Sequence, residues 1–103
     1  MIARLTFFNV KSQHVEDMKR IYNEEITPVI RSQMGNIGTW LLEPTNKIDD
    51  FISLTEWASK SDADNYESSG TYKAMLDKVR SMFNGNPLLK TYTISDSKIL
   101  AHA

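Results

Sequence analysis

The sequence predicts an α+β protein with a ferredoxin-like βαββαβ fold, in which helices cover one face of an antiparallel sheet. Three observations predict it. Four short segments have the composition and alternation of strands, two longer regions repeat apolar residues at helical spacing, and their order is strand, helix, strand, strand, helix, strand. A chain of 103 residues is enough for one hydrophobic core, so we expect a single domain over 1–103 with a tail at about 96–103.

The first strand is expected in the segment IARLTFFNV, which is rich in β-branched and aromatic residues. Side chains alternate between the two faces of a strand, so Ala3, Leu5 and Phe7 share a wholly apolar face. The opposite face is mixed and carries Arg4. We expect the mixed face to point away from the helices. Arg4 would then pair with Glu56 across a contact between two chains, because a buried charge needs a partner.

A long amphipathic helix is expected after the first strand. Ser12 is a suitable N-cap, and apolar residues then recur every three or four positions for about five turns. Pro28 should kink or loosen the last turn, because proline removes a backbone hydrogen bond. Gly35 can end the helix in the left-handed conformation. The segment IGTWLLE, stopped by Pro44, predicts the second strand.

The third strand, DFISLTEW, leads directly into a second helical region. Ser53 and Trp57 share one face of this strand. Ser61 and Asp64 form a capping signal for a short helix, which Gly70 interrupts. A further helix follows, and the segment LLKTYTIS predicts the fourth strand. The inner stripe of that further helix consists of Tyr72, Met75, Leu76, Val79 and Phe83.

The sheet face opposite the helices needs a cover of its own. Helices on only one side leave the other side open, and no third layer is encoded in the sequence. Apolar side chains there would form an exposed patch, which is unusual for a monomer. A second copy of the chain is the simplest cover, so we expect a homodimer.

The composition narrows the possible functions. The net charge is -1, which argues against binding to nucleic acid or to an anionic membrane surface. The chain has no Cys, so disulfides, thiolate chemistry and Cys-based metal sites are excluded, and a reducing cytoplasm is the expected location. No segment reaches the roughly 20 apolar residues of a membrane span. The two His residues have no acidic neighbours at metal-ligand spacing, so we expect no metal site. The sequence has no phosphate-loop or dinucleotide motif, and we expect no cofactor.

Two stretches, FISLTEWASKSDADNYESSGTYKAMLDKV and EEITPVIRSQMGNIG, resemble the antibiotic biosynthesis monooxygenase family. Members share a strand that ends in Trp, a Ser two residues later, and an aromatic-bearing helix followed by a short break. The resemblance covers nearly the whole chain, up to Ser95. It implies a dimeric α/β barrel, in which each subunit keeps a cleft between its sheet and its helices.

The resemblance also implies a choice of chemistries. One branch of the family oxidises aromatic phenols to quinones with molecular oxygen and no cofactor, a second acts on quinols, and a third binds and degrades heme. The His that ligates iron in the third branch matches Leu76 here, and its supporting residues match Ala3 and Tyr66, so heme binding is not expected. Many members carry a His where this chain has Tyr66, which leaves no obvious general base.

We therefore predict a cofactor-independent monooxygenase acting on a small aromatic phenol or quinol. The predicted catalytic residues are Trp57, Tyr66, Ser53 and Asn9. The predicted substrate-binding residues are Tyr72, Phe7 and Leu76. Structural roles remain open for the same residues: Trp57 can anchor the following helix to the sheet, and Asn9 can simply end its strand. The alternative function is a non-enzymatic dimeric barrel that binds a small apolar ligand or a partner protein.

Overall fold

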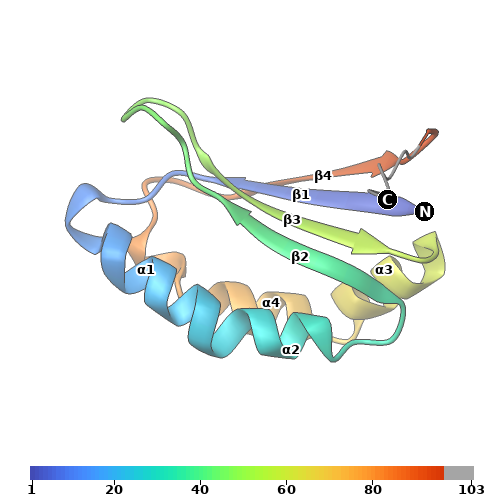
Figure 1. The fold of residues 1–103 in the computed structure, drawn as a ribbon. Coiled ribbons are helices and arrows are strands. Elements are labelled where there is room, and N and C mark those ends of the chain that lie inside the picture. Colours follow the sequence, from blue (N-terminus) through green and yellow to red (C-terminus); the bar gives the residue numbers. More distant parts are fainter. Residues whose placement is uncertain (97–103) are drawn as a thin grey trace, which may run out of the picture.

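A computed structural model describes residues 1–96, which form one four-stranded sheet with all the helices on one of its faces (Figure 1). The predicted ferredoxin-like order is confirmed. The predicted tail lies almost wholly outside the described residues. The elements are β1 (Ile2–Phe8), η1 (Ser12–His14), α1 (Val15–Ile21), η2 (Tyr22–Ile26), α2 (Thr27–Arg31), β2 (Asn36–Leu42), β3 (Phe51–Trp57), α3 (Lys60–Ser68), α4 (Thr71–Asp77), η3 (Arg80–Met82) and β4 (Leu88–Thr93).

The sheet has the strand order β2-β3-β1-β4, and each neighbouring pair is antiparallel. The two central strands, β1 and β3, therefore form the floor on which the helices pack. Their register places Thr6 opposite Ser53 and Arg4 opposite Thr55. Directly opposed residues in such a ladder have neighbouring side chains on the same face. Both pairs point toward the helices, as the burial of Thr6 and Thr55 indicates.

The prediction for the two faces of β1 is wrong. Ile2, Thr6 and Phe8 are buried against the helices, so the mixed face is the inner one. Arg4 is tolerated there because α3 supplies its partners. Its guanidinium donates to the carbonyl oxygen of Ala63 at 2.9 Å and also forms ion pairs with carboxylates on α3. Glu56 lies opposite Ala3 on the other face, so Arg4 is not on the face expected to meet a second chain and Glu56 is not among its partners within the chain.

The helical segment after β1 is continuous but changes type along its length. It begins as the 3-10 turn η1, continues as α1, widens into the π-helical turn η2 and ends as α2. In the π turn the backbone N–H of Thr27 bonds to the carbonyl oxygen of Tyr22, five residues earlier. Pro28 follows directly. A proline in a regular α-helix clashes with the carbonyl group four residues before it, and the widened turn relieves that crowding.

The second helical region begins slightly earlier than predicted. Ser59, rather than Ser61, is the N-cap of α3, and its hydroxyl accepts a hydrogen bond from the backbone N–H of Asp62 at 3.1 Å. Gly70, with φ 87°, separates α3 from α4 as expected. Helix α4 contains no fully buried residue, so it is held less tightly than α3.

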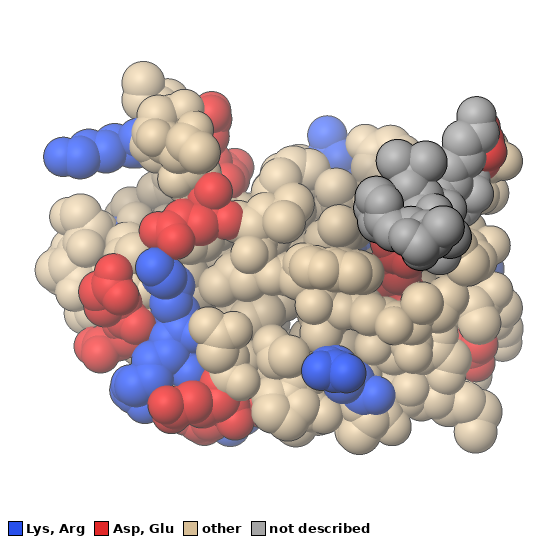
Figure 2. All heavy atoms as spheres, in the orientation of Figure 1, with Lys and Arg blue, Asp and Glu red and all other residues tan. Residues whose placement is uncertain are grey.

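The sheet face that points away from the helices carries exposed large apolar side chains together with Glu56 and Lys90. Charged side chains of both signs gather at the end of the molecule where α1 begins (Figure 2). At that end Lys19 pairs with Glu43 at 3.0 Å, which ties α1 to the start of the β2–β3 loop. Among the described residues, no helix has the length and apolar character needed to cross a membrane. The exposed large apolar side chains of the four strands are Ile37, Trp40, Leu42, Leu88 and Tyr92.

Candidate functional site: a hydroxyl-lined cavity

A cavity of about 40 Å³ lies between the inner face of the sheet and the helices. Its walls come from β1, β3, β4, η2, α2, α3, α4 and the segment that follows α4, so distant parts of the chain meet there. The lining is mostly apolar, with hydroxyl groups set into it. The lining residues are Arg4, Thr6, Phe8, Tyr22, Ile26, Ile30, Ser53, Thr55, Tyr66, Tyr72, Met75, Leu76, Val79, Phe83 and Leu89.

Two pairs of hydroxyl groups lie on the wall of this cavity. The Tyr22 phenol on η2 forms a short hydrogen bond with Ser53 on β3. The Tyr72 phenol on α4 lies 3.1 Å from the hydroxyl oxygen of Thr6 on β1. Each pair has two hydroxyl protons but uses only one of them in its mutual hydrogen bond. Each pair therefore keeps one O–H that can donate to a ligand in the cavity.

Tyr66 supplies a third phenol. Its ring stacks on Trp57, with the centroids 5.1 Å apart, and meets Tyr72 edge-on at 5.9 Å. Its hydroxyl has no hydrogen-bond partner among the described residues. Burial raises the pKa of Tyr66 well above the ordinary value near 10, and the neighbouring phenols of Tyr22 and Tyr72 raise it further. This phenol therefore stays protonated around neutral pH and acts as a donor, not as a base.

The environment of Tyr22 also raises the pKa of its phenol. Burial raises its pKa, although the hydrogen bond with Ser53 and the nearby hydroxyl of Thr39 partly oppose the shift. The Thr39 hydroxyl is buried and makes no hydrogen bond with any described residue, so it lies close to the Tyr22 phenol without bonding to it. A buried polar atom without a partner is costly, which makes this corner a natural place for a bound water.

Trp57, the residue at the junction of strand and helix, is fully buried and does not line the cavity. Its indole N–H donates to the hydroxyl oxygen of Thr55 at 2.9 Å. Through this bond and its stacking on Tyr66, Trp57 holds two lining residues in place. In this structure its donor therefore serves Thr55 and is not directed at the cavity.

The other predicted residues divide into two groups. Ser53, Tyr66, Tyr72 and Leu76 come together around the cavity. Phe7 and Asn9 do not: Phe7 lies on the open sheet face, where the Lys90 ammonium is 5.4 Å from its ring centre.

Asn9 ends its strand and ties loops together. Its amide donates to Asp50 at 3.4 Å and accepts from Asn84 at 2.9 Å. It is not part of the cavity wall.

Sequence reasoning did not select Tyr22 or Thr6 as site residues. Tyr22 lies within the apolar stripe of the first helical region, and Thr6 shares with Arg4 the strand face that was expected to point away from the helices. One signal was available. A tyrosine in an otherwise aliphatic stripe brings a hydroxyl that must find a partner when it is buried.

The described residues around the cavity lack the groups that hold a metal or a ligated cofactor. The described residues contain no cluster of three or more His, Cys, Asp or Glu side chains that could bind a metal ion. Of the lining residues that the structure describes, Arg4 is the only charged one, and none is His or Cys. The matched heme-ligand position, Leu76, is a wall residue that cannot coordinate iron. The lining residues therefore do not fit a ligated heme.

The sequence pattern of the antibiotic biosynthesis monooxygenase family matches residues 1–78. The chain belongs to this family. The match spans β1 to α4 and so includes most of the cavity wall. No curated protein sequence matches the chain.

Solved structures of this family have the same fold. A Nitrosomonas europaea protein assigned as an antibiotic biosynthesis monooxygenase is 18% identical, with a TM-score of 0.77 over 93% of this chain and 100% of its own. A Deinococcus radiodurans protein with the same assignment is 10% identical, with a TM-score of 0.80 over 99% and 100%. The heme-degrading protein MhuD of Mycobacterium tuberculosis, solved with two hemes in its active site, is 14% identical, with a TM-score of 0.77 over 95% and 99%. At these identities the likeness shows a shared fold.

Proposed function

We propose that this member of the family is a monooxygenase that oxidises a small aromatic phenol or quinol with molecular oxygen and without a cofactor. The observation that carries the proposal is the pairing of an apolar cavity with hydroxyl donors from Tyr22–Ser53, Tyr72–Thr6 and Tyr66. Such a cavity suits a flat aromatic body that carries oxygen atoms. The likeness to family members supports the reaction class.

The donors would act on the charge that forms during the reaction. A phenol reacts with oxygen most readily as its electron-rich anion, and fixed O–H donors in an apolar site stabilise an oxyanion strongly. Because burial raises the pKa values of Tyr22 and Tyr66, these groups remain protonated donors around neutral pH. The reaction is balanced without another reductant: 1-naphthol and one O₂ give 1,4-naphthoquinone and one water.

An oxygen-electrode assay with 1-naphthol tests this proposal. We expect oxygen uptake above the rate without protein, with 1,4-naphthoquinone formed in equal amount. Tyr22→Phe should lower kcat by about tenfold or more, since one well-placed donor to an oxyanion contributes roughly 2 kcal/mol or more. Tyr92→Phe, which removes a phenol from the open sheet face, is the matched control and should leave kcat unchanged. No uptake above the background rate for a series of phenols and quinols would refute the proposal.

The alternative, a non-enzymatic dimeric barrel that binds an apolar ligand or a partner protein, has an observation in its favour. Among the described residues, 1–96, no carboxylate or imidazole lines the cavity, so this part of the chain offers no general base to remove the phenol's proton. The same assay separates the two functions. Saturable binding of 1-naphthol without oxygen uptake would favour the binding protein.

We also propose that a second copy of the chain covers the open sheet face. Trp40, Leu88 and Tyr92 are each about half exposed there, which is a large apolar surface for a monomer. Obligate homodimers bury on the order of 2,000 Å² or more. Light scattering should give about twice the chain mass of 11.8 kDa at micromolar concentration. A folded, stable monomer at that concentration would contradict this arrangement.

A further inference from the structure

The cavity between the sheet and the helices is too small for the aromatic phenol or quinol that its apolar wall and hydroxyl groups would suit. Its volume is about 40 Å³, which is room for one or two water molecules. An engineered protein cavity of about 150 Å³ is large enough to bind benzene. A bicyclic phenol therefore needs more space than the inner cavity alone provides, either by extending beyond the cavity or by displacing a wall residue.

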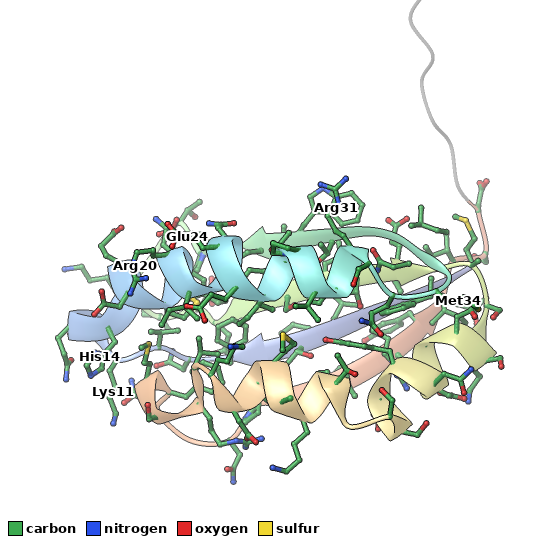
Figure 3. The ribbon with its side chains drawn as sticks, turned by 90° about the horizontal axis from the view of Figure 1, so that it is seen from below. Lys11, His14, Arg20, Glu24, Arg31 and Met34 are labelled. Carbon is green, nitrogen blue, oxygen red and sulfur yellow. The ribbon has the colours of Figure 1, made fainter. Side chains whose placement is uncertain are left out.

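A second hollow lies next to it, on the other side of Tyr66. This outer pocket has a volume of about 190 Å³ and is formed by the end of the first helical segment and α3. Figure 3 shows Met34 in the turn after α2, at the end of the molecule where α3 begins. Within residues 1–96, Tyr66 is the one residue that lines both spaces. The residues around the outer pocket are Gln33, Met34, Asp62, Asn65, Tyr66 and Ser69.

We propose that the outer pocket and the inner cavity are two halves of one binding site, and that the ring of Tyr66 is a movable partition between them. The ligand is a planar aromatic molecule with a polar edge. It enters through the outer pocket and displaces the Tyr66 ring. Its oxygen-bearing end reaches the inner hydroxyl pairs while its polar edge stays in the outer pocket. The ligand class rests on the proposed function, whereas the route past Tyr66 rests on the two cavities.

The contacts of Tyr66 suit a movable partition. Its hydroxyl makes no hydrogen bond with any described residue, so moving the ring breaks none. The ring itself is held by stacking on Trp57 and by an edge contact with Tyr72. After it moves, the Tyr66 ring can make face or edge contacts with the aromatic ligand itself, since aromatic rings favour offset and edge-on packing.

The outer pocket has a flexible side chain and a polar side chain at its rim, and its backbone is tightly packed. Met34 is 85% exposed at its rim, and methionine side chains adapt readily to ligands of different shape. The side-chain amide of Asn65 has no hydrogen-bond partner among the described residues and is free to bind a hydroxyl or carbonyl group. The turn that forms the bottom of this pocket is tightly packed, because Gly35, with φ 80°, lies directly against the Asp62 carboxyl group.

The methionines of the chain allow a direct test by NMR. With methyl-¹³C methionine, Met34 reports on the outer pocket and Met75 on the inner cavity, while Met18, fully buried elsewhere, is the control. The probe is 1-naphthol without oxygen, so that no turnover occurs. We expect the Met34 and Met75 signals to shift together, with one dissociation constant, while Met18 stays unchanged.

Other patterns of Met34 and Met75 shifts would contradict the two-part site. A shift of Met75 alone would overturn the two-part site but leave the proposed function standing, because the phenol would have entered the inner cavity by another route. A shift of Met34 alone would overturn the joining of the two spaces. No shift of either signal at millimolar 1-naphthol would overturn this inference and the proposed function together.

Variants of the partition provide a second measurement. Tyr66→Leu removes the ring between the two spaces and should speed the association of 1-naphthol in stopped-flow fluorescence. Tyr66→Phe keeps the ring and should leave the association rate unchanged. Leu89→Ala, which shortens a wall residue of the inner cavity on β4, is the control and should not speed association. Equal association rates for Tyr66→Leu and the unaltered protein would overturn the role of Tyr66.

Discussion

Replacing Trp57 by Phe should destabilise the protein without weakening ligand binding to the folded state. Trp57 is fully buried, its indole N–H donates to Thr55 at 2.9 Å, and its ring stacks on Tyr66. Losing the buried hydrogen bond costs about 1 kcal/mol. The void left by the smaller ring and its lost contacts cost roughly another 1–2 kcal/mol. We therefore expect the free energy of unfolding to fall by about 2–3 kcal/mol, which lowers Tm by roughly 10 °C or more in a domain of this size.

Thermal and urea unfolding followed by circular dichroism measure this loss. Tyr72→Phe is the matched variant, because it also removes one hydrogen bond, to Thr6, but leaves almost no void. It should cost about 1 kcal/mol. The affinity for 1-naphthol, measured well below Tm, should be unchanged in Trp57→Phe because Trp57 does not line the cavity. A Trp57→Phe protein of full stability but weakened binding would show that Trp57 contacts the ligand and would refute this reasoning.

Three further predictions follow from the same geometry. Because the folded-state pKa of Tyr66 is raised, the unfolded chain loses this proton first, so stability should fall as pH rises above about 10; Tyr66→Phe should flatten that part of the Tm–pH curve. Gly35→Ala should cost about 2 kcal/mol or more, since an added Cβ would overlap the Asp62 carboxyl group. The same change at Gly70, where the space is open, should cost only the backbone strain, and urea unfolding of both variants measures the difference. Hemin titration should show no sharp one-to-one Soret shift, since Leu76 cannot ligate iron; a ligated low-micromolar complex would contradict this.

The fold could be predicted from the sequence because its signals are local. Alternation in the strands, helical spacing of apolar residues and the turn residues between them all act within a few positions. Local alternation cannot say which face of a strand is the inner one. For β1 the apolar face was the natural choice, but Arg4 lies inside because α3, some 60 residues later, presents a carbonyl and carboxylates to it. Such pairings depend on the tertiary arrangement.

The candidate site was predictable only in part, for the same reason. Ser53, Tyr66 and Tyr72 were chosen because the strand and the second helical region carried a family resemblance. Tyr22 and Thr6 complete the two hydroxyl pairs, yet their partners are 31 and 66 positions away in sequence. Only the register of β1 against β3 and the packing of the helices bring them together.

The π-helical turn Tyr22–Ile26 determines how the protein would respond to the deletion of one residue from its first helical segment. A π turn holds one residue more than the α turn it replaces, and each residue of an α-helix accounts for about 100° of rotation. Deleting a single residue from this turn would restore a regular helix and rotate everything before it relative to α2. Met18 would then swing out of the core, and the helix would present a charged stripe to the sheet. The site thus depends on an inserted residue, and a one-residue deletion here should be far more damaging than one in the β2–β3 loop.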